Sequence, residues 1–167
     1  DPGIVAFALN SGADAFCIVP ENRQEVTTEG GLDVVAERAR LSKTIPQLQE
    51  RGGLVSLFVD PEGAQIRAAA ELGADFVELH TGTYANAAGA ERQRELQRLV
   101  SAAALAQSAG LRVNAGHGLD YENVAPVATI EGLEELNIGH SIVARSILVG
   151  AGAAVREMRE AIDASKG

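Results

Sequence analysis

The sequence predicts a single α/β domain over residues 1–167, built from repeated strand–helix units. Short and almost wholly apolar segments recur along the chain, and longer segments with helical periodicity lie between them. A Gly-Ala-Asp junction also occurs twice, at Gly12 and at Gly73, each time directly before an apolar segment. A glycine that ends a helix before a buried strand is typical of α/β units, and the two junctions are separated by the length of about two such units.

Five segments are expected to form buried parallel strands. They are Ala15–Pro20, Leu54–Val59, Phe76–His80, Leu111–Ala115 and Glu135–Gly139. Each is short and largely apolar, as in strands covered by helices on both faces of a sheet. Cys17 lies within the first strand, where we expect a small buried hydrophobic side chain in a reducing compartment.

Helical patterns fill the intervals between these strands. The expected helices run from Gln65 to Leu72 after a cap at Asp60, from Ala90 to Ala109, from Thr44 to about Arg51, and from a cap at Ser141 to about Ala164, with residues 1–11 as the tail of another. Five strands connected in this way fit either an open doubly wound sheet or the last five units of an eight-stranded barrel, which typically needs about 250 residues. Periodicity alone is consistent with both.

The composition limits the partners of the chain. Hydrophobic residues make up 46% and charged residues 22%, and the formal net charge is −9. A nucleic acid or an anionic membrane surface is therefore not expected as a partner, because binding phosphates in bulk requires a basic surface. The longest apolar stretch is interrupted by Arg145, so we expect no membrane span and a cytoplasmic protein. One small phosphorylated substrate remains compatible, because backbone amides can hold it.

The three histidines of the chain stand at the ends of three expected strands. His80 ends Phe76–His80, His117 follows Leu111–Ala115, and His140 follows Glu135–Gly139. In parallel α/β folds the carboxyl ends of the strands are where loops converge to form a site. Packing alone gives no reason for three titratable rings at three such ends, so we expect a functional site there.

Two of these strand ends have glycine patterns that suit a ligand. His117 lies between Gly116 and Gly118, where the backbone can approach a ligand and the ring can act as a general acid or base. The alternative is a histidine that merely ends a strand. Gly139 and His140 lie at the start of an expected helix, whose first amides form an anion site. Together with Gly118 they are candidates to hold one phosphate.

Two further segments are candidates for the same site. Pro20–Gly31 is polar and ends in two glycines, as in a mobile lid, although a plain solvated loop has the same composition. Glu78 and His80 fall on one face of their strand, so they either line the site or are buried and satisfied within the sheet. No paired histidine spacing indicates a metal, and no metal or organic cofactor is expected.

The motifs together resemble those of the pyridoxine 5′-phosphate synthase family. They are Val19-Pro20-Glu21, Arg23 to Asp33, Glu78-Leu79-His80-Thr81-Gly82, Val113 to Leu119 and Glu135 to His140, and they occur in the family's order along the whole chain. The resemblance implies a (β/α)8 TIM-type barrel that condenses 1-deoxy-D-xylulose 5-phosphate with 3-amino-2-oxopropyl phosphate in vitamin B6 synthesis. The five expected strands would then be strands four to eight of that barrel.

The resemblance also implies roles for single residues. It makes His117 the proton donor, Thr27 a contact to the deoxyxylulose phosphate, and Gly118, Gly139 and His140 contacts to the aminoketone phosphate. Glu21 and Arg23 are possible further residues of the site, beside Glu78 and His80. The family is expected to form homo-oligomers.

The departure from the family pattern is at the amino-terminal side. The family's first three strand–helix units, with two of its proton-transfer residues, have no counterpart in these 167 residues. We therefore expect this chain by itself to lack synthase activity. The resemblance leaves two rivals: another phosphate-binding barrel isomerase or lyase, and a non-catalytic half-barrel that binds ligands. Lys43 and Lys166 end no strand, which disfavours an aldolase with a Schiff-base lysine.

Overall fold

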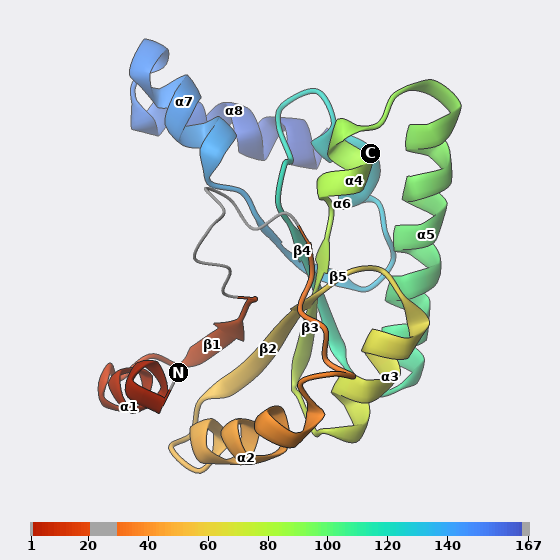
Figure 1. Ribbon diagram of the computed structural model, residues 1–167. Coiled ribbons are helices and arrows are strands. Elements are labelled where there is room, and N and C mark those ends of the chain that lie inside the picture. Colours follow the sequence, from red (N-terminus) through yellow and green to blue (C-terminus); the bar gives the residue numbers. More distant parts are fainter. Residues whose placement is uncertain (1, 21–29, 165–167) are drawn as a thin grey trace.

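The computed structural model describes residues 2–20 and 30–164, which are organised around one parallel sheet of five strands (Figure 1). The strands are β1 (Ala15–Ile18), β2 (Leu54–Val59), β3 (Phe76–His80), β4 (Arg112–Gly116) and β5 (Leu133–Asn137). Their spatial order follows their sequence order, and every neighbouring pair is parallel. This order is that of consecutive strands in a barrel, whereas a doubly wound sheet reverses its order partway across.

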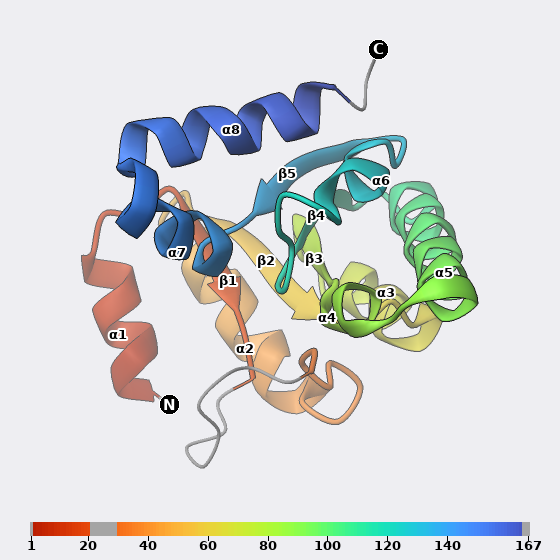
Figure 2. The ribbon, with the colours of Figure 1, turned by 90° about the horizontal axis from the view of Figure 1, so that it is seen from above.

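Helices connect the strands, and some of them cover one face of the sheet (Figure 2). They are α1 (Pro2–Asn10), α2 (Arg38–Gln49), α3 (Gly63–Glu71), α4 (Gly82–Asn86), α5 (Gly89–Ser108), α6 (Val124–Ala128), α7 (His140–Val149) and α8 (Ala151–Asp163). α2 and α3 contact β2, and α5 contacts β3 and β4. The core between these helices and the sheet contains fully buried residues such as Leu57, Val77 and Val113.

The two faces of the central strands differ in chemistry. In β3, Val77 and Leu79 point into the apolar core under the helices, whereas Glu78 and His80 alternate with them and lie on the opposite, inner face. Asn114 of β4 pairs with Glu78 in the strand register and belongs to the same inner face. The inner face thus carries polar side chains beside the aromatic rings of Phe58 and Phe76, whereas the face under the helices is apolar.

Full burial of the strands was predicted correctly for β2, β3 and β4, which lie in the middle of the sheet. The prediction was wrong for the two outer strands, because β1 and β5 consist only of exposed and partly buried residues. Cys17 is therefore exposed and not a buried hydrophobic residue. The reason is its place on the inner face of an outer strand, where the helices on the other face cannot cover it.

The largest error in the predicted helices concerns Pro46. The sequence placed the start of a helix at Thr44, but α2 begins at Arg38 and contains Pro46 in its interior. Proline lacks an N–H and normally disrupts a helix there. Leu41, Ile45 and Leu48 are buried with helical spacing, and the apolar contact they make with the sheet outweighs that cost.

The predicted last helix consists of two helices in the structure. Gly150 separates α7 from α8 with a φ of 83°, a left-handed backbone conformation that glycine adopts readily. The prediction that Ser141 caps this helix was wrong. Gly139 is the N-terminal capping residue, and the Ser141 hydroxyl donates to the Leu119 carbonyl at 2.8 Å. Among the described residues, no helix is long and apolar enough to cross a membrane.

The stability of the fold should depend on the apolar layer under the helices. Replacing Leu57, which has 0% exposure, with Ala should lower the free energy of unfolding by about 2–5 kcal/mol, because the cavity does not fully collapse. The same change at Leu148, which is 78% exposed, should cost less than about 0.5 kcal/mol. Urea unfolding followed by circular dichroism measures both. Equal losses would contradict this assignment of the core.

Candidate active site

Three strand ends meet at one edge of the sheet. Asp60 follows β2, His80 ends β3 and His117 follows β4. The register pairs His80 with Gly116, so the residue after Gly116 lies beside the His80 ring. The two imidazole centroids are 5.1 Å apart and their planes are tilted by 59°. The site predicted at the strand ends is therefore formed by His80 and His117, which the sequence separates by more than thirty residues.

His80 is held in place from two sides. Its Nδ1 lies 2.8 Å from Oδ1 of Asp60, and its ring packs against Phe58 with centroids 5.2 Å apart. The His80 side chain is only 5% exposed, whereas Asp60 is 39% exposed. The hydrogen bond to His80 is the main cause that lowers the pKa of Asp60 below its ordinary value. Asp60 is thus a carboxylate at neutral pH.

Thr81 joins the ends of β3 and β4. Its hydroxyl lies within hydrogen-bond distance of two carbonyls, that of Gly116 at 2.6 Å and that of His117 at 2.5 Å. The Thr81 backbone N–H also donates to Gly116 at 2.8 Å. Thr81 is fully buried, so these contacts are shielded from competing water. They fix the backbone on both sides of the bond that leads into His117.

His117 has an unusual backbone conformation. Its φ is 82°, the only positive value for a residue other than glycine among the described residues. A side chain in this left-handed region costs about 1–2 kcal/mol, and such strain is concentrated at functional sites. Gly118 follows with a φ of 76°, so the chain turns sharply here. The flanking glycines were expected to let the backbone approach a ligand, and their pattern did not predict this left-handed turn.

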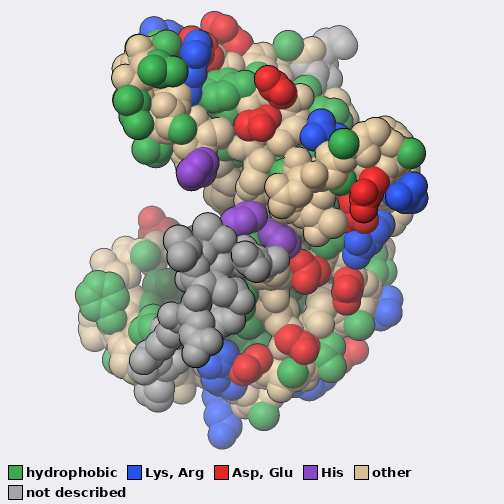
Figure 3. Space-filling model, turned by 45° about the horizontal axis from the view of Figure 1, so that its top comes forward, with side chains coloured by type: hydrophobic (Ala, Val, Ile, Leu, Met, Phe, Trp, Pro, Cys, Tyr) green, Lys and Arg blue, Asp and Glu red, His purple; other side chains and the backbone are tan. Residues whose placement is uncertain are grey.

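Burial, and secondly the repulsion from a protonated His80, lower the pKa of His117 below its ordinary value. The His117 ring is therefore neutral at pH 7. Two of the three histidine side chains lie together on the surface shown in Figure 3, and the third lies apart. The adjacent two are His80 and His117, given their contact. His140 is the separate one, and it is exposed at the first position of α7.

A pocket of about 480 Å³ opens beside the two rings. Its lining comprises His80, Gly82, Thr83, Asn86, Ala87, Glu91 and His117. A Cβ atom on Gly82 would lie 2.4 Å from Nε2 of His80 and 3.1 Å from Cδ2 of His117. Glycine at this position therefore keeps open the space between the two rings, and a small polar ligand can reach both.

Glu78 lies on the inner face two residues before His80 in β3. It is 9% exposed and accepts a hydrogen bond from the Cys17 thiol at 3.4 Å. Burial raises the pKa of Glu78, and a contact with Asn137 opposes that rise. Burial also raises the pKa of Cys17 to about 12, with the Glu78 charge as the second cause. The thiol is exposed by accessible surface, yet its sulfur faces Glu78 and stays protonated.

The predicted phosphate contacts lie on two loops that the structure brings together. The bond from Ser141 to the carbonyl of Leu119 ties the loop after β4 to the start of α7. Gly118 is therefore near Gly139 and His140, and all three are exposed. No side chain caps α7, so its first amides stay available to an anion. Glu21, Arg23 and Thr27 lie outside the described residues.

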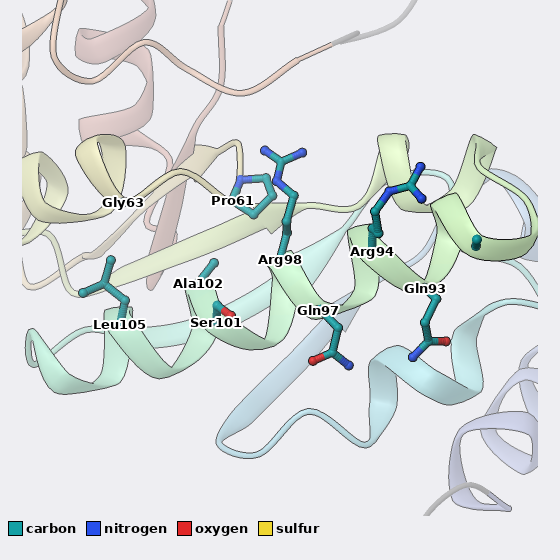
Figure 4. Close-up of a pocket in the computed structure, with 10 residues that line it drawn as sticks. Pro61, Gly63, Gln93, Arg94, Gln97, Arg98, Ser101, Ala102 and Leu105 are labelled. Carbon is teal, nitrogen blue, oxygen red and sulfur yellow. The ribbon is translucent and has the colours of Figure 1, made fainter.

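A second cavity, of about 640 Å³, lies on the outer side of the fold between α5 and the loop after β2 (Figure 4). Arg98 extends along it beside Pro61 and forms an ion pair of 2.8 Å with Glu95. The three histidines do not line this cavity. Within the described ranges, no three side chains of His, Cys, Asp or Glu are grouped as metal ligands.

Sequence reasoning missed Asp60 and Thr81 as parts of the site. Asp60 was assigned as a helix cap, but the N-terminal capping residue of α3 is Glu62, and Asp60 binds His80 instead. A usable signal existed, since Asp60 directly follows a buried strand, as His117 does. Thr81 gave no such signal, because only the folded backbone shows which carbonyls its hydroxyl reaches.

The fold and the position of the site define a class. The chain is an α/β protein of the (β/α)8-barrel type with its polar site at the carboxyl ends of the strands. Among solved structures it is similar to the tryptophan synthase A-subunit of Pyrococcus furiosus, with a TM-score of 0.60 and 16% identity over 96% of this chain and 59% of that chain. It is also similar to the citrate synthase SbnG, with a TM-score of 0.56 and 16% identity over 99% of this chain and 71% of that chain. These likenesses show the fold alone.

The family follows from the sequence comparison. The chain belongs to the family of the pyridoxal phosphate biosynthesis protein PdxJ, whose model matches residues 1–164. It is 58% identical to the pyridoxine 5′-phosphate synthase of Prochlorococcus marinus strain MIT 9303, over 96% of this chain and 66% of the relative. It is 53% identical to the pyridoxine 5′-phosphate synthase of Akkermansia muciniphila, over 97% of this chain and 66% of that relative. The chain thus spans about two thirds of the length of these relatives. The resemblance seen in the motifs is confirmed.

Replacing Thr81 with Val should lower the free energy of unfolding by about 1–3 kcal/mol, because the one hydroxyl proton that the Gly116 and His117 carbonyls share is lost while the side-chain shape is kept. The matched control is Thr44→Val, since the half-buried Thr44 makes one local, solvent-exposed bond to the Arg40 carbonyl, and it should cost well under about 1 kcal/mol. Urea unfolding curves decide the comparison. A loss at Thr81 no greater than at Thr44 would show that this contact does not fix the turn.

The lowered pKa of His117 predicts how the stability of the chain depends on pH. The His117 ring takes up a proton more readily in the unfolded chain, where its pKa is about 6.5, than in the folded chain. The contribution of the neutral ring to the free energy of unfolding is therefore complete above about pH 6.5. It should be lost as the pH falls through the folded-state pKa. His80→Gln should raise the pKa of His117 towards its ordinary value, while burial keeps it lowered. NMR titration of the ring measures this, with His140→Gln as the control. An unchanged pKa in His80→Gln would exclude charge coupling between the rings.

Proposed function

We propose that this chain forms the His117-bearing part of a pyridoxine 5′-phosphate synthase. The single observation that carries the proposal is His117, held in a strained turn between two glycines at the end of β4, in a chain of the PdxJ family. The proposed reaction condenses 1-deoxy-D-xylulose 5-phosphate with 3-amino-2-oxopropyl phosphate to pyridoxine 5′-phosphate, phosphate and water. The two rivals, another phosphate-binding isomerase or lyase and a binding module, have no comparable support.

The proposed role of His117 is to protonate an oxygen that leaves or develops charge. A lowered pKa makes the protonated ring a readier donor. The resting ring is neutral, so it must first take a proton from the substrate, and the condensation of an amine with a ketone releases such protons. The amides around Gly118, Gly139 and His140 would hold one phosphate, which is consistent with the exposed and uncapped start of α7. No metal and no organic cofactor enters this scheme.

The proposal extends to the rest of the enzyme. We infer that the five strands are consecutive strands of an eight-stranded barrel, with further strands meeting the exposed outer strands β1 and β5. Thr27 is proposed to contact the second phosphate, and Glu21 and Arg23 to lie near it. The enzyme is proposed to be a cytoplasmic homo-oligomer that binds small phosphorylated substrates and neither nucleic acid nor membrane, in accord with its net charge of −9.

The test is a chimera in which these 167 residues replace the segment they match in the Prochlorococcus marinus relative. The chimera should form pyridoxine 5′-phosphate, whereas the 167-residue chain alone should not. His117→Asn in the chimera should lower kcat roughly 10²–10⁴-fold. Substrate dissociation constants should change little, because Asn tolerates the left-handed backbone.

The control is His140→Asn, which should weaken binding of the phosphorylated aminoketone modestly and leave the proton chemistry intact, since the phosphate contact there is through the backbone. A steady-state assay combined with calorimetric titration separates the two effects. Binding without product in the parent chimera would favour a binding module. Unchanged kcat in His117→Asn would remove His117 from the proton chemistry.

A further inference from the structure

The Asp60–His80 pair is a part of the site that the proposed roles of His117 and the phosphate contacts leave unused. The two side chains come from neighbouring strand ends, and the ring nitrogen Nδ1 lies 2.8 Å from the carboxylate oxygen Oδ1. His80 is almost wholly buried, and its ring contacts both Phe58 and His117. A buried imidazole with one nitrogen committed to a carboxylate is a common device for fixing the other nitrogen for chemistry.

The contact determines which nitrogen of the neutral ring carries the proton. An ionised carboxylate only accepts hydrogen bonds, so Nδ1 of His80 must be the donor. The neutral ring then has a free electron pair on Nε2. This nitrogen faces the open space above Gly82, since a Cβ atom placed there would lie 2.4 Å from it. The same space borders Cδ2 of His117 and belongs to the pocket of about 480 Å³.

We propose that His80 is a second acid–base residue of this site and that Asp60 is its positioning residue. This inference relies on the proposed function for its chemistry, and it adds a proton acceptor at Nε2 of His80 to the donor at His117. A hydroxyl or ammonium group of the bound substrate gives its proton to Nε2, and the electron pair stays on the oxygen or nitrogen. His80 becomes an imidazolium, whose charge the Asp60 carboxylate balances.

Asp60 is itself fixed by its surroundings. The carboxylate receives a backbone hydrogen bond from Gly31, and Arg98 of α5 adds a weaker attraction. Gly31 packs so closely against the start of this loop that a Cβ atom there would lie 2.1 Å from the Asp60 nitrogen. The charged or titratable groups that face the pair are therefore His117, Arg98 and, in the lining of the pocket, Glu91. Asp60 can hold one orientation although it is partly exposed.

The first test reads the tautomer of His80 by long-range proton–nitrogen NMR on the 167-residue chain at neutral pH. His80 should carry its proton on Nδ1, with Nε2 unprotonated. Asp60→Ala should abolish this preference and give a mixture of the two tautomers. The matched control is Asp75→Asn, because Asp75 is a hydrogen-bonded carboxylate at the opposite end of β3 and should leave the His80 signals unchanged. A proton on Nε2 in the unmodified chain would overturn the proposal.

The second test measures turnover in the chimera described above. His80→Gln should lower kcat roughly 10²–10⁴-fold, and Asp60→Ala should lower it about tenfold or more, with KM changed little in both. The limb of the pH–rate profile that reports the acceptor should disappear in His80→Gln. Asp60→Glu should recover part of the lost kcat. Unchanged kcat and pH profile in His80→Gln would overturn the acid–base role.

The two tests can contradict the proposed function and the role of His80 independently of each other. If the parent chimera forms no pyridoxine 5′-phosphate, the proposed function fails, and the NMR measurement alone decides whether Asp60 fixes His80. If the parent chimera is active and the NMR tautomer is as expected, the variants decide whether that orientation serves the reaction. A circular dichroism spectrum for each variant checks that the change has not unfolded the chain.

Discussion

The pairing of β3 with β4 is the constraint on which the site depends. Parallel hydrogen bonds align His80 with Gly116, and Thr81 then links the backbones of both strands just beyond the sheet. A shift of one residue would send His80 into the apolar core and would part it from His117, because side chains alternate between the faces of a sheet. The buried residues Val77 and Leu79 oppose such a shift, since they would have to move onto the polar face. The packing of the core thus fixes the geometry of the chemistry.

The sequence was sufficient to locate the strands and to predict where a site would lie. The apolar segments located all five strands, because burial under helices needs apolar residues and their length separates them from helices. The glycines beside His117 indicated a backbone that can approach a ligand, and the structure adds a left-handed turn at His117 and Gly118 that they did not predict. The motif resemblance reached the family that the comparison confirms. The order of the strands, which periodicity left undecided, followed only from that resemblance and from the structure.

The sequence was insufficient where one residue type has two uses. Asp60 before Pro61 fits a helix cap as well as a partner for His80, and only the neighbouring strand decides between them. Pro46 fits a helix start, but the buried face of α2 carries the helix through it. Cys17 is apolar enough for a core, yet its strand is at the edge of the sheet. In each case contacts between segments far apart in the chain override a local preference.

The left-handed backbone at His117 has a consequence for how this position can change. Any side chain there has a conformational cost that glycine does not have, and His117 is flanked by glycines on both sides. A chain selected only for resistance to heat would therefore gain by losing its imidazole and extending the run of glycines. Under the proposed function, the histidine persists only while its chemistry is required. A glycine at this position in another member of the family would accordingly be a sign that the fold had been kept after the proposed proton donor was given up.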